Sequence, residues 1–252
     1  MTKQHEVMFE TDGRHSSIYL YEPPMSIRQY VEPIDEIIDT GIDTVSYVVG
    51  DCAVLLYDTK VGEIWGDNHD LLDSDVWYKA AFNVRMMIDS GYDPLKVVLE
   101  HTHARGMKFI PHLLLNMVHS EPSRVTSGRV ATYNTQHPEW IVGPEPDHPE
   151  AVDDNPNRMS YSVPEIRENR LSVIRELVTD YQSDGIELNF NTYTPLIARR
   201  EVAEHTETLT DWMRQIRQTV DTAAETQGRP KRIIARVAAS VAGNKSIGHD
   251  IE

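Results

Sequence analysis

The chain has 252 residues, of which 40% are hydrophobic, so it can bury a substantial core as one large α/β domain or two small ones. Its formal net charge of -16, from 40 acidic and 24 basic residues, disfavours nucleic acids and anionic membrane surfaces as partners, because like charges repel. The single cysteine, Cys52, excludes an internal disulfide.

Five short β-branched or aliphatic runs recur along the chain, each followed by a polar loop and a segment with helical apolar spacing. The runs span 6–11, 44–49, 108–115, 185–190 and 232–239. Helices are predicted over 26–41, 75–89, 94–106, 162–181 and 201–227. Two of them begin with the spacing of a capping box, Ser26 with Gln29 and Ser162 with Glu165, in which side chains satisfy the free amides of the first turn.

Alternating strands and helices favour a parallel sheet, which leaves two architectures open. An open doubly wound sheet would be favoured by a Gly-rich first turn, but no G-x-G-x-x-G or G-x-x-x-x-G-K-[ST] motif follows any run. We therefore predict an α/β fold of the (β/α)8, TIM-barrel type, incomplete and with about five β/α units, because a full barrel typically needs about 250 residues or more. Residues 1–252 would form a single barrel domain, truncated at its C-terminal end. Its unpaired strand edges predict a chain that is unstable alone or pairs those edges.

Working groups in parallel α/β folds lie at the carboxyl ends of the strands and in the loops that follow. This rule selects Asp12 and His15 after the first run and Asn116 and His119 after the third as substrate-binding candidates, and His112 within the third run is a further candidate. Hydrogen-bond donors and acceptors beside aromatic rings suit a sugar ligand. Ordinary surface loops contain the same residue types, so each candidate also has a plain structural explanation.

The fourth run carries the most information. Its period of two places Glu187, Asn189 and Asn191 on one face, toward the barrel mouth, and its apolar residues on the other. A carboxylate inside a strand is costly to bury unless it is paired or has a function, and Arg236 of the fifth run has the parity to face Glu187. Glu187 is therefore either half of a barrel salt bridge or a catalytic general acid or base. In the second case Asn189, Asn191 and Arg236 would contact substrate.

Residues 183–190, Ser-Asp-Gly-Ile-Glu-Leu-Asn-Phe, resemble the family-10 glycosylhydrolase-like proteins and related bacterial barrel groups. Their pattern is Asp-Gly-Ile or Val, a variable residue, an aliphatic residue and Asp, and Asn116 and His119 also resemble that group's Asn and His in the third loop. The resemblance implies a glycoside-hydrolase-like barrel with a carbohydrate ligand. This chain has Asn189 where the pattern has Asp, and an amide can neither donate a proton as an acid nor attack as a nucleophile at neutral pH.

Two functions follow from this resemblance. The first is a glycoside hydrolase with Glu187 as acid/base, whose second carboxylate would come from a late strand outside this sequence. The second is a catalytically silent carbohydrate-binding barrel, favoured by Asn189. An aldolase or isomerase acting on a sugar phosphate is disfavoured, because the sequence shows neither a Lys at a strand end nor a phosphate-cradling Gly loop.

We predict no metal site and no cofactor. His101 and His103 are two residues apart, so on a helix they point to different sides. The N-terminus lacks the basic start and apolar run of a secretory signal, and no apolar run reaches the ~18 residues needed to span a bilayer. We therefore expect a soluble, cytoplasmic protein with no membrane partner, and the oligomeric state stays open.

Overall fold

Five parallel strands form the centre of the structure, a computed structural model that describes residues 6–68, 72, 74–116, 129–145, 158–249 and 251. They lie side by side in chain order and are β1 (Met8–Thr11), β2 (Thr44–Asp51), β5 (Lys108–Leu114), β6 (Gly185–Asn189) and β7 (Arg232–Arg236). Among the described strands β1 pairs only with β2 and β7 only with β6, so the barrel is not closed. This arrangement confirms the predicted incomplete barrel.

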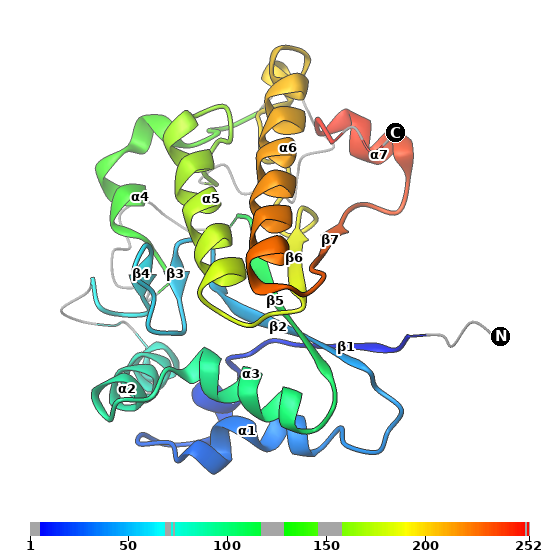
Figure 1. The fold of residues 1–252 in the computed structure, drawn as a ribbon. Helices are drawn as coiled ribbons and strands as arrows, with labels where there is room; N and C mark the ends of the chain where they lie inside the picture. The colour runs from blue at the N-terminus through cyan, green and yellow to red at the C-terminus, as the bar shows by residue number, and fades with distance from the viewer. Residues whose placement is uncertain are drawn as a thin grey trace, which may run out of the picture.

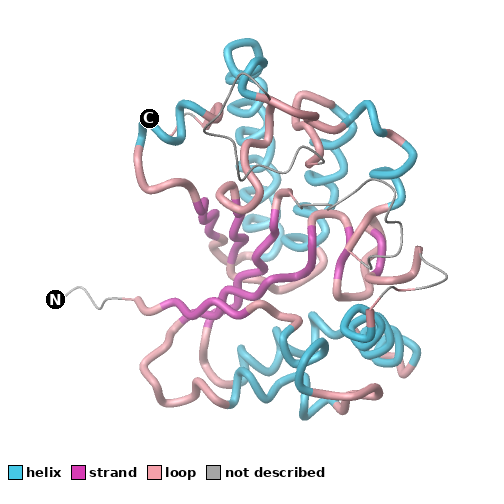
Figure 2. Tube along the Cα trace, turned by 180° about the vertical axis from the view of Figure 1, so that it is seen from behind, coloured by secondary structure: helices cyan, strands magenta, loops and turns pink. Residues whose placement is uncertain are grey.

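Helices pack on the outer face of the strands, in two groups that lie on opposite sides of the strands in Figure 1. The first group is α1 (Ile27–Asp35), α2 (Asp75–Asp89) and α3 (Pro94–Ala104), and the second is α5 (Pro164–Thr179) and α6 (Val202–Gln227). Within these groups α1 packs on α3, and α5 packs on α6. Figure 2 shows from behind how the strands run as one band between the two groups. Helix α3 packs on β5, α5 on β6 and α6 on β7, so these helices cover neighbouring strands of the chain, as in a β/α barrel.

Shorter elements complete the described chain. They are the π-helix η1 (Ser16–Leu20), strands β3 (Val54–Leu55) and β4 (Glu63–Ile64), helix α4 (Thr132–Gln136), the 3-10 turns η2 (Pro138–Trp140) and η4 (Arg199–Glu201), and helix α7 (Val241–Ser246). Strand β3 turns back antiparallel to the end of β2. No helix in the part of the chain described here is long and apolar enough to cross a membrane.

Alternation along each strand separates an apolar outer face from a polar inner face. In β2 the side chains of Val45, Tyr47 and Val49 belong to the buried apolar core beneath the helices. Thr44 and Ser46 have the opposite parity and are also buried, but their hydroxyls donate hydrogen bonds to Glu6 and Glu187 on the inner face. The inner face of this open barrel is therefore a polar surface, and it carries the groups from which a site can be built.

The Asp-Gly pair at the start of β6 has a structural explanation. A Cβ at Gly185 would lie 2.3 Å from the carbonyl oxygen of Arg232, so only glycine lets β7 approach this closely. The carboxylate of Asp184 accepts hydrogen bonds from the backbone amide of Phe109 and from His103, each at 2.8 Å. These two residues fasten β6 to its neighbours at the amino ends of the strands.

Two ion pairs connect the outermost strands across the open barrel. The carboxylate of Glu6, just before β1, lies 2.5 Å from a guanidinium nitrogen of Arg232 on β7, and Glu10 lies 2.7 Å from Arg236. Glu6 and Glu10 are four residues apart, as are Arg232 and Arg236, so the two ion pairs lie one above the other on the inner face. The hydrogen bond from Arg232 is the main cause that lowers the pKa of Glu6 to about 2. These two ion pairs thus bridge β1 and β7, which no hydrogen-bond ladder joins.

Local signals located the starts of most helices, but the first helix was predicted to reach residue 41, whereas α1 ends at Asp35 and continues as turns. Helix α2 has the predicted bounds, and Ser26 and Gln29 form the predicted capping box of α1. The capping box predicted at Ser162 is wrong: α5 begins at Pro164, its N-cap is Val163, and the Ser162 hydroxyl lies 2.8 Å from that of Ser160. Proline suits the first helical position because it lacks an amide hydrogen, and it moves the start of the helix past the serine.

Candidate functional site

Glu187 lies on the inner face of β6 and is almost completely buried. Its side chain is 1% exposed, and one carboxylate oxygen is 2.8 Å and 2.7 Å from two guanidinium nitrogens of Arg236. The other oxygen accepts a hydrogen bond from the Ser46 hydroxyl at 2.5 Å. The neighbouring Ile186 and Leu188 face the apolar core, as the strand period predicts. The predicted pairing of Glu187 with Arg236 across adjacent strands is therefore present.

His112 lies beside this carboxylate and is fully buried. Its Nδ1 is 4.0 Å from the Glu187 carboxylate and 3.3 Å from that of Glu10, without hydrogen-bond geometry to either. Its Nε2 is 3.1 Å from the amide nitrogen of Asn189. Burial lowers the pKa of His112 although the two carboxylates act in the opposite direction, so the imidazole is neutral at pH 7. With Asn189 donating to Nε2, the ring proton is assigned to Nδ1.

Glu10 is a site residue that the sequence argument missed. Its carboxylate contacts Arg236, so Glu10 and Glu187 share one guanidinium. Unlike Glu187, the Glu10 side chain is 39% exposed and accessible to a ligand. The signal was available, because the period of two within 6–11 places Glu6 and Glu10 on the face opposite Val7 and Phe9. Ser46 could have been found in the same way.

Asn189 ends β6 and organises the turn that follows. Its side-chain oxygen accepts hydrogen bonds from the backbone amides of Asn191 at 3.0 Å and Thr192 at 2.9 Å. Its amide nitrogen faces His112. Asn191 itself is exposed beyond the strand. The residue that departs from the Asp pattern thus joins the buried histidine to the rim of the barrel.

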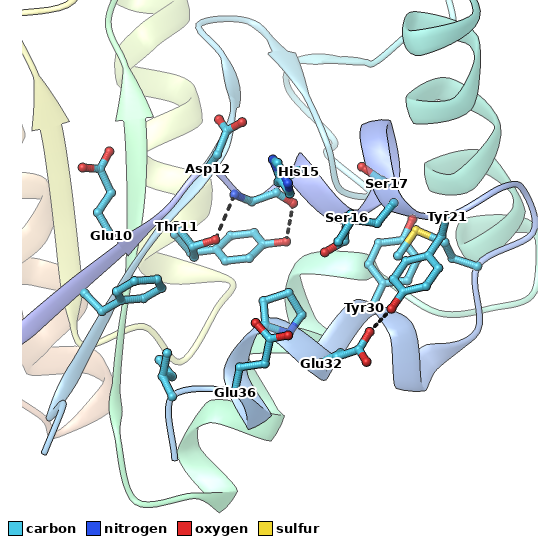
Figure 3. Close-up of a pocket in the computed structure, with 17 residues that line it drawn as sticks. Glu10, Thr11, Asp12, His15, Ser16, Ser17, Tyr21, Tyr30, Glu32 and Glu36 are labelled. Atoms are coloured by element: carbon cyan, nitrogen blue, oxygen red, sulfur yellow. Dashed lines mark hydrogen bonds between the residues drawn. The ribbon is translucent and has the colours of Figure 1, made fainter. Parts of the chain in front are cut away.

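The structure brings together four of the predicted site residues, Glu187, His112, Asn189 and Arg236. Asp12 and His15, both labelled in Figure 3, follow β1 and form no hydrogen bond or ion pair with these four residues. Asp12 pairs with Arg14 at 3.0 Å, and the exposed ring of His15 packs against Tyr19 with ring centroids 5.2 Å apart.

Asn116 is buried, and its side chain forms hydrogen bonds with the main chain of Met159. Its side-chain amide donates to the carbonyl of Met159 at 2.9 Å, and its oxygen accepts from the Met159 amide at 3.2 Å. His119 lies outside the described residues. Asn116 thus fastens the end of β5 to a segment 43 residues further along the chain.

A second charged group lies at the carboxyl end of β2. The buried carboxylate of Asp51 is 2.6 Å from Arg14 and 2.8 Å from Arg129. The guanidinium of Arg14 lies over the ring of Trp65, and that of Arg129 over Trp77. Stacked, paired arginines of this kind give this rim a rigid polar and aromatic wall.

No grouping of three or more His, Cys, Asp or Glu residues suited to a metal ion occurs within the described ranges. The two histidines weighed as a metal pair have separate partners: His101 lies 2.7 Å from Asp35 and His103 lies 2.8 Å from Asp184.

Comparisons with known proteins agree with this architecture. "Glycosyl hydrolase YngK" of Bacillus subtilis (strain 168) is 24% identical over 221 residues, which are 78% of this chain and 38% of that protein. "Glycosyl hydrolase DigH" of Escherichia coli (strain K12) is 24% identical over 174 residues, 65% of this chain and 34% of that protein. The chain thus spans little more than a third of the length of these relatives.

A solved structure with a similar fold is alpha-L-fucosidase isoenzyme 2 from Paenibacillus thiaminolyticus, with a TM-score of 0.56 and 14% identity over 91% of this chain and 32% of that one. At this identity the likeness concerns the fold alone. The sequence model described as "Glycosyl hydrolase-like 10" matches residues 16–211, well over half of the chain. The chain therefore belongs to the glycosyl hydrolase-like 10 family.

Proposed function

We propose that this chain forms a carbohydrate site that acts on a glycosidic bond, with Glu187 and Glu10 as its carboxylate pair. The observation that carries the proposal is the shared arginine: both carboxylates contact the guanidinium of Arg236, and His112 lies within 4.0 Å of both. Hydrolysis of a glycosidic bond ordinarily uses two carboxylates that flank the reacting carbon. In this proposal the second carboxylate comes from β1, within the chain, and not from a late strand.

The two carboxylates differ in burial, and we assign them different roles for that reason. Glu10 is accessible and meets the sugar, so it exchanges the proton with the leaving oxygen or the attacking water. Glu187 lies beneath it, held in one orientation by Arg236 and Ser46, and supplies negative charge opposite the oxocarbenium-like transition state. This assignment moves the acid/base role, first given to Glu187, to its more exposed neighbour.

A second candidate function is carbohydrate binding without cleavage. It is favoured by Asn189, which stands at the strand end where the family pattern has Asp and whose oxygen is already bonded to two backbone amides. It is also favoured by the enclosure of Glu187, both of whose oxygens have protein partners. A carboxylate held in this way can shape a binding surface without reacting.

A combined turnover and binding assay on a panel of aryl glycosides and oligosaccharides distinguishes the two candidate functions. If the pair is catalytic, Glu10→Gln and Glu187→Gln each lower turnover by about 10²–10⁴-fold while a responsive ligand still binds. Glu204→Gln, an exposed glutamate on α6, is the matched control and leaves both readouts unchanged. Binding with no turnover by the wild-type chain supports the silent barrel, and Asn189→Asp then tests whether one carboxylate restores cleavage. Turnover unaffected by both Gln variants would exclude the proposed pair.

A further inference from the structure

The turn that follows β6 fixes the orientation of the Asn189 side-chain amide. Its oxygen accepts hydrogen bonds from the backbone amides of Asn191 at 3.0 Å and Thr192 at 2.9 Å. In the flipped orientation the side-chain nitrogen would face these two N–H donors, and neither hydrogen bond could form. The NH₂ group of Asn189 therefore faces His112, whose Nε2 is 3.1 Å away.

This contact selects one of the three protonation forms of the His112 ring. An Nε2 that accepts a hydrogen bond from an amide carries no proton, which excludes both the Nε2–H tautomer and the imidazolium ion. Burial of the ring also disfavours the imidazolium ion and lowers the pKa of His112. The proton of the neutral ring is therefore on Nδ1. Asn189 thus determines which nitrogen of His112 is the hydrogen-bond donor.

The Nδ1–H group is buried and has no hydrogen-bond acceptor within the described residues. The carboxylate oxygens near it are Oε1 of Glu10 at 3.3 Å and Oε1 of Glu187 at 4.0 Å. The charged groups that act on the ring are these two carboxylates, Asp12 after β1 and Arg236 on β7. A buried N–H without an acceptor is costly, so native structures seldom leave one unused.

Of the two nearby carboxylates, Glu10 is the one that can complete this hydrogen bond. Glu187 is 1% exposed, and Arg236 and Ser46 already bind its two oxygens. The Glu10 side chain is 39% exposed, with Oε2 on Arg236 at 2.7 Å and Oε1 near His112. A small rotation of the Glu10 carboxylate would bring Oε1 into line with Nδ1–H while Oε2 keeps its contact with Arg236.

We propose that Asn189 and His112 position Glu10 for the reaction. Asn189 holds the ring as its Nδ1–H tautomer, and this N–H group and Arg236 together fix the two oxygens of the Glu10 carboxylate. Both are positioning residues, because they act through Glu10 and not on the sugar. The role toward Glu10 rests on the proposed function, whereas the tautomer of His112 does not depend on it. An aspartate at position 189 could not hold this tautomer, because a carboxylate only accepts and would draw the proton to Nε2.

Nitrogen-15 NMR of the histidine rings tests the tautomer, because protonated and unprotonated ring nitrogens have different chemical shifts. The signals of His112 are assigned by their loss in His112→Asn. We expect a protonated Nδ1 and an unprotonated Nε2 at pH 7, and a protonated Nε2 in Asn189→Asp. Asn191→Asp adds the same charge on an exposed side chain two residues away and should leave the tautomer unchanged. A protonated Nε2 in the wild-type chain, or an unprotonated one in Asn189→Asp, would overturn the proposal.

The same spectra test the contact with Glu10 without any need for turnover. The resonance of the Nδ1 proton should shift in Glu10→Gln, because the neighbouring carboxylate loses its charge. It should stay in place in Glu204→Gln, which removes the charge of an exposed glutamate on α6. An Nδ1 proton that responds equally to both variants would show that Glu10 is not its partner.

Kinetics test the positioning role on a glycoside that the wild-type chain cleaves. His112→Leu should lower kcat by about 10–10²-fold and change KM by less than about twofold, because the orientation of Glu10 is lost but no contact with the sugar. His112→Asn keeps an N–H donor near the position of Nδ1 and should recover part of kcat. Equal kcat losses in the two variants, both shown to be folded by thermal unfolding, would reduce His112 to a packing residue and overturn the positioning role. If the wild-type chain cleaves no glycoside, the proposed function fails, and the two NMR readouts still decide whether Asn189 sets the tautomer and whether Nδ1–H meets Glu10.

Discussion

Replacing Arg236 by methionine keeps an unbranched apolar side chain in place of the arginine stem but removes the guanidinium that pairs with Glu187 and Glu10. Glu187 is 1% exposed, so without Arg236 its charge keeps only the Ser46 hydroxyl bond. Removing one partner of a buried ion pair typically costs about 3–5 kcal/mol, because the remaining charge is left uncompensated. Arg236 is itself 35% exposed and water reaches its side of the pair, so we expect a smaller loss of about 2–3 kcal/mol.

The free energy of unfolding in urea measures this loss, and thermal unfolding should show a Tm lowered by about 4–12 °C for a chain of this size. The double variant Arg236→Met/Glu187→Gln removes the stranded charge together with its partner. It should therefore be more stable than Arg236→Met alone, with a coupling energy of about 1–2 kcal/mol. Arg214→Met is the matched control, because Arg214 makes only exposed ion pairs on α6 and its loss should cost less than about 0.5 kcal/mol.

A loss of stability in Arg236→Met no larger than that in Arg214→Met would contradict this prediction. Simple addition of the destabilisations of Arg236→Met and Glu187→Gln in the double variant would contradict it as well. Either result would mean that the charge of Glu187 is not held by Arg236 in solution.

Three further predictions concern pH and association. The pKa of Glu6 is lowered to about 2 in the folded chain, so its pairing with Arg232 stabilises the fold above about pH 4.5 and this stabilisation is lost as the pH falls toward 2. In Glu6→Gln the free energy of unfolding in urea should therefore depend less on pH between 4.5 and 2. His249 is 6% exposed with neither ring nitrogen bonded in the described structure, and burial lowers its pKa to about 4, so stability should fall from pH 6.5 to pH 4. His249→Leu should remove that fall in pH-dependent thermal unfolding, and an unchanged profile would contradict the assignment. The unpaired edges of β1 and β7 predict association or low stability of the 252-residue chain, and a monomer in light scattering that melts cooperatively would count against this.

Much of the fold was determined by the sequence alone, because the signals are local. The period of 3.6 and a capping residue fixed the bounds of α2 and the start of α1. The period of two placed Glu187 on the inner face of β6 and gave Arg236 the parity to meet it. Alternation of the five units indicated a parallel sheet and an incomplete barrel.

Tertiary structure decided how residues from distant segments meet. Ser46 bonds to a glutamate 141 residues away, and Glu10 shares Arg236 with Glu187 across a barrel that is not closed. Strand parity limits which side chains face inward, but the curvature of the sheet and the register of its strands determine which of them come within bonding distance. The unpartnered hydroxyl of Tyr30 likewise exists only because α1 packs where it does. Periodicity acts over a few residues, whereas contacts across a barrel depend on the summed geometry of all its strands.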